Sequence, residues 1–342
     1  HTYASVGTYD VSLTVTTSTG SDSETKTGFI NINCLPQTYV PDDNFEAYLE
    51  THDANGNVVA VGASNSMGDG IANNDFVTTD NISVYIATLD VSNQNIADLT
   101  GIEDFTNINR LNCSNNVITY LDVSNTNISN ELIISNNPQL TVLNIENKGF
   151  WIWDWSGLPL LDSIHAANFY FDFRTFNTLT SLRYIDLSNS QGSLMLEATP
   201  VLNYVDFSNN NLGLYLNLWL DNSPELSYLN LTGTDVTDLK IFSSKLNSID
   251  LSSASSLTDI LLLNNDSLTS LDLSHQTLLS SVNLDLSSLS SLDIRNGNNT
   301  NIYNFNASGS PNLQCISVDN TAYSNANWTS IDANTSFSDD CA

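Results

Sequence analysis

The amino-acid sequence predicts a mainly β fold, a solenoid whose coils are about 21 residues long and carry two facing parallel sheets. The first observation is that pairs of apolar residues return about every ten or eleven residues over most of the chain. The second is that these returns form two interleaved series, each with a step of about 20 to 24 residues. The third is that polar turns rich in Asn and Ser follow the pairs. Such a coil cannot bury its own apolar face and must stack on its neighbours.

The two series define two expected sheets. The series called sheet B opens at Leu111, Leu132, Trp153, Phe173, Leu194, Leu216, Leu239, Leu261, Val282 and Tyr303. The series called sheet A opens at Leu121, Leu143, Ile164, Ile185, Val205, Leu229, Ile249, Leu271 and Leu292. In each strand the first and third residues are expected to face the core, and the second and fourth to face outward.

Two coils resemble the leucine-rich-repeat pattern LxxLxLxxNxL, namely LNCSNNVI and VDFSNNNL. The matching positions are Leu111, Cys113, Asn116, Ile118, Val205, Phe207, Asn210 and Leu212. Their alternation with LDVSN and IDLSN resembles the short-coil repeats of secreted Bacteroidetes surface proteins, as do the segments YVPDDNFEAYLE and LDVSNQNIADLTGIEDF. The resemblance covers roughly residues 39 to 341 and implies a leucine-rich-repeat solenoid, but it implies no particular ligand.

The N-terminal residues 9 to 32 are expected to form a β-hairpin, because GTYDVSLTV and ETKTGFINI both alternate apolar and polar residues around the turn TSTGSD. The stretch HTYASVGTYDVSLTV resembles the closing part of a PKD domain, an immunoglobulin-like β-sandwich, so residues 1–33 are assigned to a partial PKD-like sandwich. Either residues before His1 complete that sandwich or the piece packs elsewhere, since a lone hairpin is marginally stable.

The next segment, residues 34–82, is expected to contain a linker, a short capping helix and a loop rich in Asp, Asn and Gly. Asp42 or Asp43 is the candidate N-cap of the helix. The apolar residues on one face of this helix are Phe45, Tyr48 and Leu49. The helix is expected to cover the first coil, because terminal repeats otherwise expose an apolar face and unpaired strand edges.

The loop after this helix has the composition of a calcium site. Calcium takes about six to eight oxygen ligands, which carboxylate and amide side chains supply. The spacing differs from that of an EF-hand, and the same residue types dominate ordinary turns, so a loop without an ion is the alternative. The candidate metal ligands are Asp53, Asn55, Asn57, Asp69 and Asp75.

The outward second positions of sheet A form a monotonous acidic column. Neighbouring rungs lie about 4.8 Å apart, so adjacent carboxylates repel by roughly 1 kcal/mol per pair in water. A solvated face tolerates this repulsion, and cations shared between rungs are the alternative. The positions are Asp122, Asn144, His165, Asp186, Asp206, Asn230, Asp250, Asp272 and Asp293.

The outward positions of sheet B are varied, which makes this face the candidate binding surface between about residues 172 and 262. Scattered exposed apolar residues without a function are the alternative. The positions include Ile152, Asp154, Asp172, Arg174, Phe176, Met195, Tyr215, Asn217, Trp219, Lys240, Phe242 and Leu262. The ligand-binding candidates among them are Arg174, Tyr215, Trp219, Lys240 and Phe242.

The segment FWIWDWSG alternates three tryptophans, Trp151, Trp153 and Trp155, as does a platform on which sugars stack. The register instead places all three toward the core, together with Phe171 and Phe173. A slip of one residue would expose them, so the sugar platform stays the alternative.

Four cysteines are present. Cys315 and Cys341 bracket a non-repetitive end and are expected to form a disulfide that closes the last coil, as in many extracellular repeat arrays. Cys113 occupies an inward position and is expected to be a buried free thiol. The sequence leaves the state of Cys34 open.

Composition excludes several functions. The 8 Lys and Arg against 38 Asp and Glu give a formal net charge of −30, which repels nucleic acid and anionic membranes. The chain has no run of apolar residues long enough to insert into a membrane. Catalysis is not expected either, because no nucleophile, metalloprotease or phosphate-loop motif is present. No metal motif contains any of the histidines, His1, His52, His165 and His275.

Residues 83–314 are therefore expected to form the solenoid and residues 315–342 a C-terminal cap. The expected function is recognition or adhesion outside the cell or on its surface, with a protein or a glycan as the partner. The competing hypothesis is structural, a stalk or self-assembling subunit of an extracellular filament or surface layer, whose partner is another copy of the chain. Calcium is the one cofactor considered.

Overall fold

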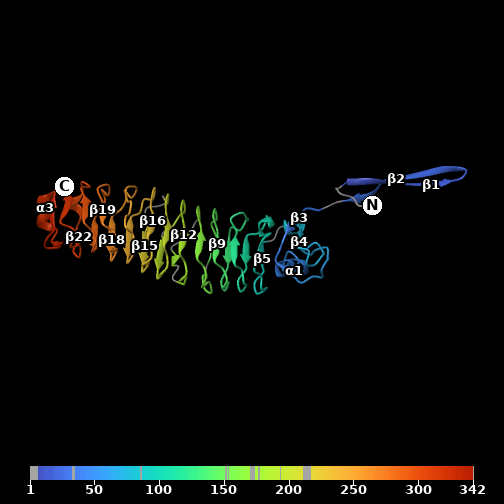
Figure 1. Cartoon of the computed structure of the whole chain (residues 1–342), viewed down its shortest axis with the longest axis horizontal. Coiled ribbons are helices and arrows are strands. Elements are labelled where there is room, and N and C mark those ends of the chain that lie inside the picture. The colour runs from blue at the N-terminus through green and yellow to red at the C-terminus, as the bar shows by residue number, and fades with distance from the viewer. Residues whose placement is uncertain are drawn as a thin grey trace.

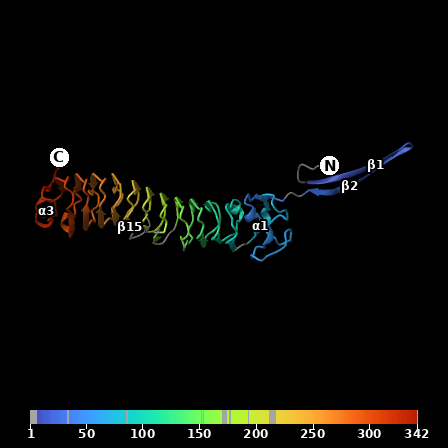
Figure 2. The ribbon, with the colours of Figure 1, turned by 60° about the horizontal axis from the view of Figure 1, so that its bottom comes forward.

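The coils stack along one axis into a long rod, with helix α1 (Asp43–Thr51) near one end and α3 (Thr321–Asn327) at the other (Figure 1). A second view shows the same rod with the N-terminal hairpin extending beyond it (Figure 2). The mainly β solenoid predicted from the sequence is confirmed. A computed structural model describes residues 7–32, 35–84, 87–150, 152, 154–169, 174–175, 178–192, 194–210 and 217–341, with the backbone alone at 31–32 and 174–175.

Sheet B is parallel and consists of two segments. The three-stranded segment contains β5 (Thr88–Asp90), β6 (Arg110–Asn112) and β8 (Glu131–Ile133). The eight-stranded segment contains β11 (Arg174–Thr175), β13 (Leu194–Glu197), β15 (Asn217–Asp221), β17 (Asp238–Phe242), β18 (Asp259–Leu263), β20 (Ser281–Asp285), β22 (Asn304–Ala307) and β24 (Ser330–Ile331).

Sheet A is also parallel and also divided in two. Its six-stranded segment contains β7 (Tyr120–Asp122), β9 (Val142–Asn144), β10 (Ser163–His165), β12 (Tyr184–Asp186), β14 (Tyr204–Asp206) and β16 (Tyr228–Asn230). Its four-stranded segment contains β19 (Ser270–Asp272), β21 (Ser291–Ile294), β23 (Cys315–Val318) and β25 (Ser336–Ser338). Strands β23, β24 and β25 lie in the expected C-terminal cap, so this cap also continues both sheets.

The remaining elements lie at the N-terminus and between strands. The antiparallel hairpin of β1 (Gly7–Thr17) and β2 (Gly20–Ile32) exposes apolar side chains such as Leu13 and Phe29. The other elements are β3 (Gln37–Tyr39), β4 (Phe76–Thr78), α2 (Thr79–Ile82) and the 3-10 helices η1 (Ile102–Asp104) and η2 (Asn299–Asn301). No helix in the described ranges combines the length and apolarity that a bilayer span requires.

Buried asparagines tie neighbouring coils together inside the solenoid. The amide nitrogen of Asn116 donates to the carbonyl oxygens of Val91 and Cys113, at 2.9 and 3.0 Å. Its amide oxygen accepts from the backbone N–H groups of Gln94 and Ile96. Each bond satisfies a backbone group that would otherwise be buried without a partner, which is why the repeat carries Asn among its apolar residues.

Corners of the coils use asparagine in another way. Recurrent asparagines adopt left-handed backbone conformations, with φ between 51° and 60°, which Asn tolerates better than most residues. Gly157 takes the corner one coil after Asn136, with φ of 70°. A Cβ atom there would lie 2.3 Å from the Asn136 side-chain oxygen, so the close stacking of corners requires glycine at this position.

The N-terminal cap is attached to the first coil by one aspartate. Asp42 is the N-cap of α1, and its Oδ1 accepts from the N–H groups of Asn44 and Phe45 at 3.0 Å. Its Oδ2 accepts from Ala97 and Asp98 in the first coil, at 2.7 and 3.1 Å. One side chain therefore stabilises both the helix terminus and its position over the core.

The cysteines are placed as follows. Cys315 and Cys341, the pair expected from the sequence, form a disulfide, with Cα atoms 5.8 Å apart. Cys113 is a buried free thiol in the core, where burial raises its pKa to about 12. Such a thiol is inert at neutral pH. Cys34 lies outside the described residues.

The expected register of sheet B is wrong at Leu261 and Leu262. Leu262 is buried with Ile260, and Leu261 faces outward, because Asp259 aligns with Asp238 of the preceding coil. The run DILLL fits either register from its apolar residues alone. The register with Asp259 outward is favoured because an unpaired carboxylate in the core would cost several kcal/mol.

Other inward and outward assignments also fail. Ile152, expected outside, is buried, whereas Trp155, expected inside, does pack half-buried against the core. Tyr303, expected inside, is 79% exposed, and Phe305 takes the rung beside Val282 because the turn before it contains the extra helix η2. The remaining residues of the expected Trp and Phe cluster lie outside the described residues, at Trp151, Trp153, Phe171 and Phe173.

Candidate binding surface

The outer face of sheet B brings three of the predicted residues together. Trp219 of β15 aligns with Met195 of β13 and with Lys240 of β17 on adjacent rungs. The Trp219 and Phe242 rings lie 6.3 Å apart between centroids, at an angle of 41°. A hollow of about 170 Å³ opens beside Trp219, and its lining residues are Met195, Asn217, Leu218, Trp219, Asp238 and Lys240.

The charge of Lys240 is already engaged on this surface. Its Nζ lies 2.7 Å from a carboxylate oxygen of Asp238 and 5.5 Å from the centroid of the Trp219 ring. Both side chains of the ion pair are about two-thirds buried, at 32% and 28% exposure. The salt bridge and the cation–π contact hold Lys240 against Trp219, which makes the surface rigid before any ligand arrives.

The other two predicted ligand-binding residues are less well placed by the structure. Tyr215 lies outside the described residues, as does the side chain of Arg174. The backbone of β11 aligns Arg174 with Leu194, whereas the sequence pattern aligns Phe173 with Leu194. The expected register of this strand is therefore wrong by one residue, and the surface described here rests on Trp219, Lys240 and Phe242.

The acidic column of sheet A has a structural role. In eight of its nine positions the side-chain oxygen accepts the backbone N–H two residues later, as Asp186 does from Ser188 at 2.8 Å. This arrangement is an Asx turn, and it closes the corner of each coil. Asn144 and Asn230 also donate to Asp122 and Asp206 on neighbouring rungs, which reduces the repulsion along the column.

We expect Asp250→Ala to lower the free energy of unfolding by about 0.5–1 kcal/mol at neutral pH, and Asp250→Asn to cost less, because only Asn keeps the Asx turn. The N–H of Ser252 holds the pKa of the Asp250 carboxyl below its ordinary value. This contribution is therefore present above the unfolded pKa of about 3.9 and is lost as pH falls through the folded pKa. Urea melts of both variants from pH 7 to pH 3 test this. Equal losses would contradict the turn assignment.

A column of tyrosines runs beside this acidic column. Tyr184, Tyr204 and Tyr228 occupy one outward position on β12, β14 and β16. Successive ring centroids lie 4.7 and 4.4 Å apart, with interplanar angles of 12° and 6°. Burial first, and then the charge of Asp206, raise the pKa of Tyr204 above its usual range. The sequence analysis missed this stack, although a Tyr directly before the inward residue in successive coils signals it.

The expected calcium ligands fall into separate groups. Asp53 accepts the N–H groups of Asn55 and Asn57 at 3.0 and 2.9 Å, and these bonds lower the pKa of its carboxyl. Asp69 accepts instead from the side chains of Gln37 and Asn74, both at 3.0 Å. Asp53, Asn55 and Asn57 thus bond to one another, whereas Asp69 bonds to other residues, and calcium binding in this loop stays a prediction.

The carboxylate cluster closest to a metal-binding geometry is a different one. Side-chain oxygens of Asp43, Glu46 and Asp75 all lie within 4.8 Å of one another. The two oxygens of Glu46 already accept N–H groups from Asn74 and Asp75, at 3.1 and 3.0 Å. Glu46 is fully buried, and these two hydrogen bonds satisfy its carboxylate. They attach the loop that contains Asn74 and Asp75 to helix α1.

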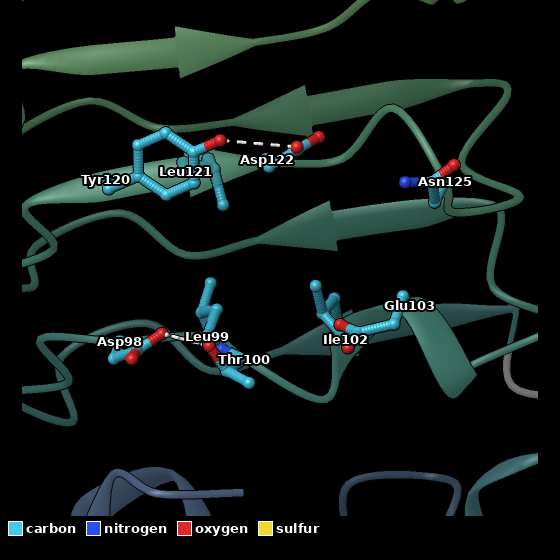
Figure 3. A pocket seen from close by; sticks show the side chains of 9 residues that line it. All are labelled: Asp98, Leu99, Thr100, Ile102, Glu103, Tyr120, Leu121, Asp122 and Asn125. Carbon is cyan, nitrogen blue, oxygen red and sulfur yellow. Dashed lines mark hydrogen bonds between the residues drawn. The ribbon is translucent and has the colours of Figure 1, made fainter. Parts of the chain in front are cut away.

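A further hollow of about 260 Å³ lies between the first coils, and its lining residues include Asp98, Glu103 and Tyr120 (Figure 3). The Tyr120 hydroxyl donates to Asp122 at 3.3 Å. Asp98 accepts from Thr100, and Glu103 accepts from the N–H of Gly101. These carboxylates therefore hold turns of the backbone in place.

The described histidines also have structural contacts. His52 stacks on Tyr48 with ring centroids 4.0 Å apart, and its Nδ1 lies 2.9 Å from the Tyr48 carbonyl oxygen. His165 tilts against Tyr184 at 5.0 Å. His275 Nδ1 lies 3.1 Å from the hydroxyl of Ser274, the residue before it in the chain.

Several solved structures have some similarity to this chain, with low TM-scores. The chain is similar to the functional domain of InlJ from Listeria monocytogenes, which includes a cysteine ladder, with 19% identity and a TM-score of 0.23 over 85% of this chain and 78% of that chain. It is also similar to the LRIM1/APL1C complex, with 17% identity and a TM-score of 0.25 over 74% of this chain and 51% of that chain. The chain therefore spans about half the length of the second protein.

These scores carry no inference about a ligand. No protein-family model matches the sequence, and no curated protein matches it. The fold is defined by the coils themselves, which form a mainly β solenoid with two parallel sheets.

Proposed function

We propose that this solenoid is a secreted or cell-surface recognition module that binds a protein or glycan through the outer face of sheet B. The observation that carries the proposal is the contact of Trp219 with Phe242 and with Lys240, beside a hollow that Trp219 and Lys240 line. Aromatic residues beside a held cation are typical of the hot spots of interfaces. The adjacent Met195 adds a side chain that adapts to apolar partner surfaces, so this composition favours a protein over a glycan.

Coverage of the first coil supports recognition over filament formation by end-to-end stacking. Asp42 attaches α1 to this coil, and at the other end the Cys315–Cys341 disulfide ties the chain after β25 to β23. Uncovered terminal coils would offer strand edges to another copy of the chain. Lateral self-association through sheet B would use the same aromatic surface and is distinguished by the oligomeric state.

We expect the double substitution Trp219→Ala and Phe242→Ala to weaken ligand binding by about a hundredfold, because hot-spot aromatics each contribute about 1–2 kcal/mol or more to a complex. The probes are a glycan array and a display library of extracellular proteins, followed by a titration of the strongest ligand. Both rings are half-buried, so the melting temperature is recorded for each variant.

Tyr303→Ala is the matched control, since Tyr303 is 79% exposed and belongs to a distant coil of the same sheet. It should leave affinity unchanged. Sedimentation of the free chain separates the two partner classes, because a recognition module stays monomeric without ligand. Retained affinity in the double variant, or concentration-dependent assembly that the double variant abolishes, would refute the proposal.

A further inference from the structure

The tyrosine stack on sheet A ends at Tyr228. Parallel strands in register place equal positions about 4.8 Å apart, which allows rings on successive rungs to stack face to face. Tyr184, Tyr204 and Tyr228 fill three successive rungs in this way. The residue at the same position of the next coil is Ser248, which has no ring. One face of Tyr228 therefore has no ring of this column next to it.

Sheet A is interrupted at the same place. Strand β16 is the last of the six-stranded segment, and β19 begins the four-stranded one, so residues 248–250 belong to neither. Ile249 still packs half-buried against the core, so this coil keeps its place in the stack. Tyr228 is 44% exposed, whereas Tyr184 and Tyr204 are half-buried. The end of the stack is thus an accessible aromatic surface above a rung of small residues.

Polar groups beside this ring accept hydrogen bonds. Asp250 is exposed on the neighbouring position of the empty rung, and one of its oxygens accepts from Ser252. Asn230, beside Tyr228 on β16, uses its amide to bond Asp206 and its oxygen to bond Thr232. The second oxygen of the exposed Asp250 carboxylate can accept further donors, and a carboxylate only accepts.

Charge selects the class of ligand. The column beside the tyrosines is acidic over most of its length, and the whole chain carries a formal net charge of −30, so anionic ligands are repelled. A ligand for this place needs a face of weakly positive C–H groups, which meets the negative face of the Tyr228 ring. It also needs hydroxyl groups that donate to the Asp250 carboxylate. The pyranose ring of an uncharged glycan has both, with C–H groups on its face and hydroxyls on its rim.

We propose that the free face of Tyr228, above the rung of Ser248 and Asp250, binds a pyranose ring of an uncharged glycan, so that the sugar continues the tyrosine stack by one ring. The column beyond this point continues with Ser270 and Ser291, both exposed. Adjacent sugars of an oligosaccharide can therefore follow the solenoid axis over these ring-free rungs. This site is independent of the Trp219 surface, which lies on the other sheet.

The test is a glycan array probed with the full chain, carrying neutral hexopyranose oligosaccharides and, as a second arm, sialylated and sulfated ones. The strongest neutral oligosaccharide is then titrated by calorimetry against the variants. We expect Tyr228→Ala to weaken it about tenfold or more, and Tyr228→Trp to retain binding within about threefold, since stacking needs a ring. Asp250→Asn, which keeps the Asx turn, should weaken binding several-fold.

Tyr120→Ala is the matched control, because Tyr120 occupies the same column on β7, is 52% exposed and has Val142 rather than Tyr as its neighbour. It should leave the titration unchanged, as should the double substitution at Trp219 and Phe242. Absence of any neutral ligand on the array, preference for the acidic arm, or affinity that Tyr228→Ala leaves intact would each overturn the proposal. Loss of affinity only in the Trp219 and Phe242 variant would assign the glycan to sheet B instead.

Discussion

Leu187→Asp is expected to unfold several coils and to lower the free energy of unfolding by about 4 kcal/mol or more. Leu187 is 2% exposed, and its backbone N–H donates to the backbone carbonyl oxygen of Asp206 in the next coil at 2.8 Å. A carboxylate at this position has no partner in the core, and every coil depends on its neighbours for burial, so the damage spreads along the solenoid. Urea melts followed by circular dichroism measure the loss.

The control for this substitution is Asp186→Asn, the adjacent outward residue, which should change stability by less than about 0.5 kcal/mol. Asn144 already fills the equivalent position two coils earlier and forms the same turn with Glu146. A loss below about 1 kcal/mol for Leu187→Asp would mean that the assigned register of sheet A is wrong.

Cys315→Ser is expected to destabilise the C-terminal cap by about 3 kcal/mol, because the disulfide closes a segment of 26 residues and restricts its unfolded state. Within this segment Trp328 stacks on Phe305 with centroids 4.2 Å apart, and Phe337 meets both rings. Opening the bridge should therefore loosen this aromatic cluster first. Hydrogen exchange should accelerate in residues 318–338 and stay unchanged in β7 to β14.

Cys113→Ala serves as the control, since it removes a buried thiol that forms no bridge. Its effect should be limited to the coils around β6. Equal protection of residues 318–338 in Cys315→Ser and in the unaltered chain would show that packing alone holds the cap.

The fold could be predicted because every coil buries its apolar residues in the same way. Alternating apolar residues fix which side chains of Leu121, Val123 and their equivalents face the core, and all nine openings of sheet A face inward as expected. The helix that covers the first coil could also be predicted, because an N-cap aspartate and three apolar residues on one face specify it locally.

The predicted register is wrong where the apolar residues fit two registers or where a turn changes in length. DILLL at residues 259–263 satisfies the core in either phase, and the pairing with the preceding coil selects one. The added turn η2 moves Phe305 into the rung expected for Tyr303. These are contacts between coils, so a reading of one coil at a time does not contain them.

The candidate binding surface could be predicted in part, because the repeat fixes which residues share a face. Trp219, Lys240 and Phe242 were placed on one surface by their periodicity, but the ion pair with Asp238 depends on side-chain geometry. The acidic column looked like a solvated face, and its carboxylates prove to hold the corners of the coils. The stack of tyrosines follows from register between strands, which becomes visible only when three coils are aligned.

Sheet A is interrupted along the rod at a place where sheet B is continuous. Sheet A is divided between β16 and β19, where the eight-stranded segment of sheet B runs past from β11 to β24. At this break the hydrogen-bond ladder of sheet B still joins the coils on either side. A bend of the rod at this place would therefore open sheet A further while sheet B keeps the neighbouring coils together.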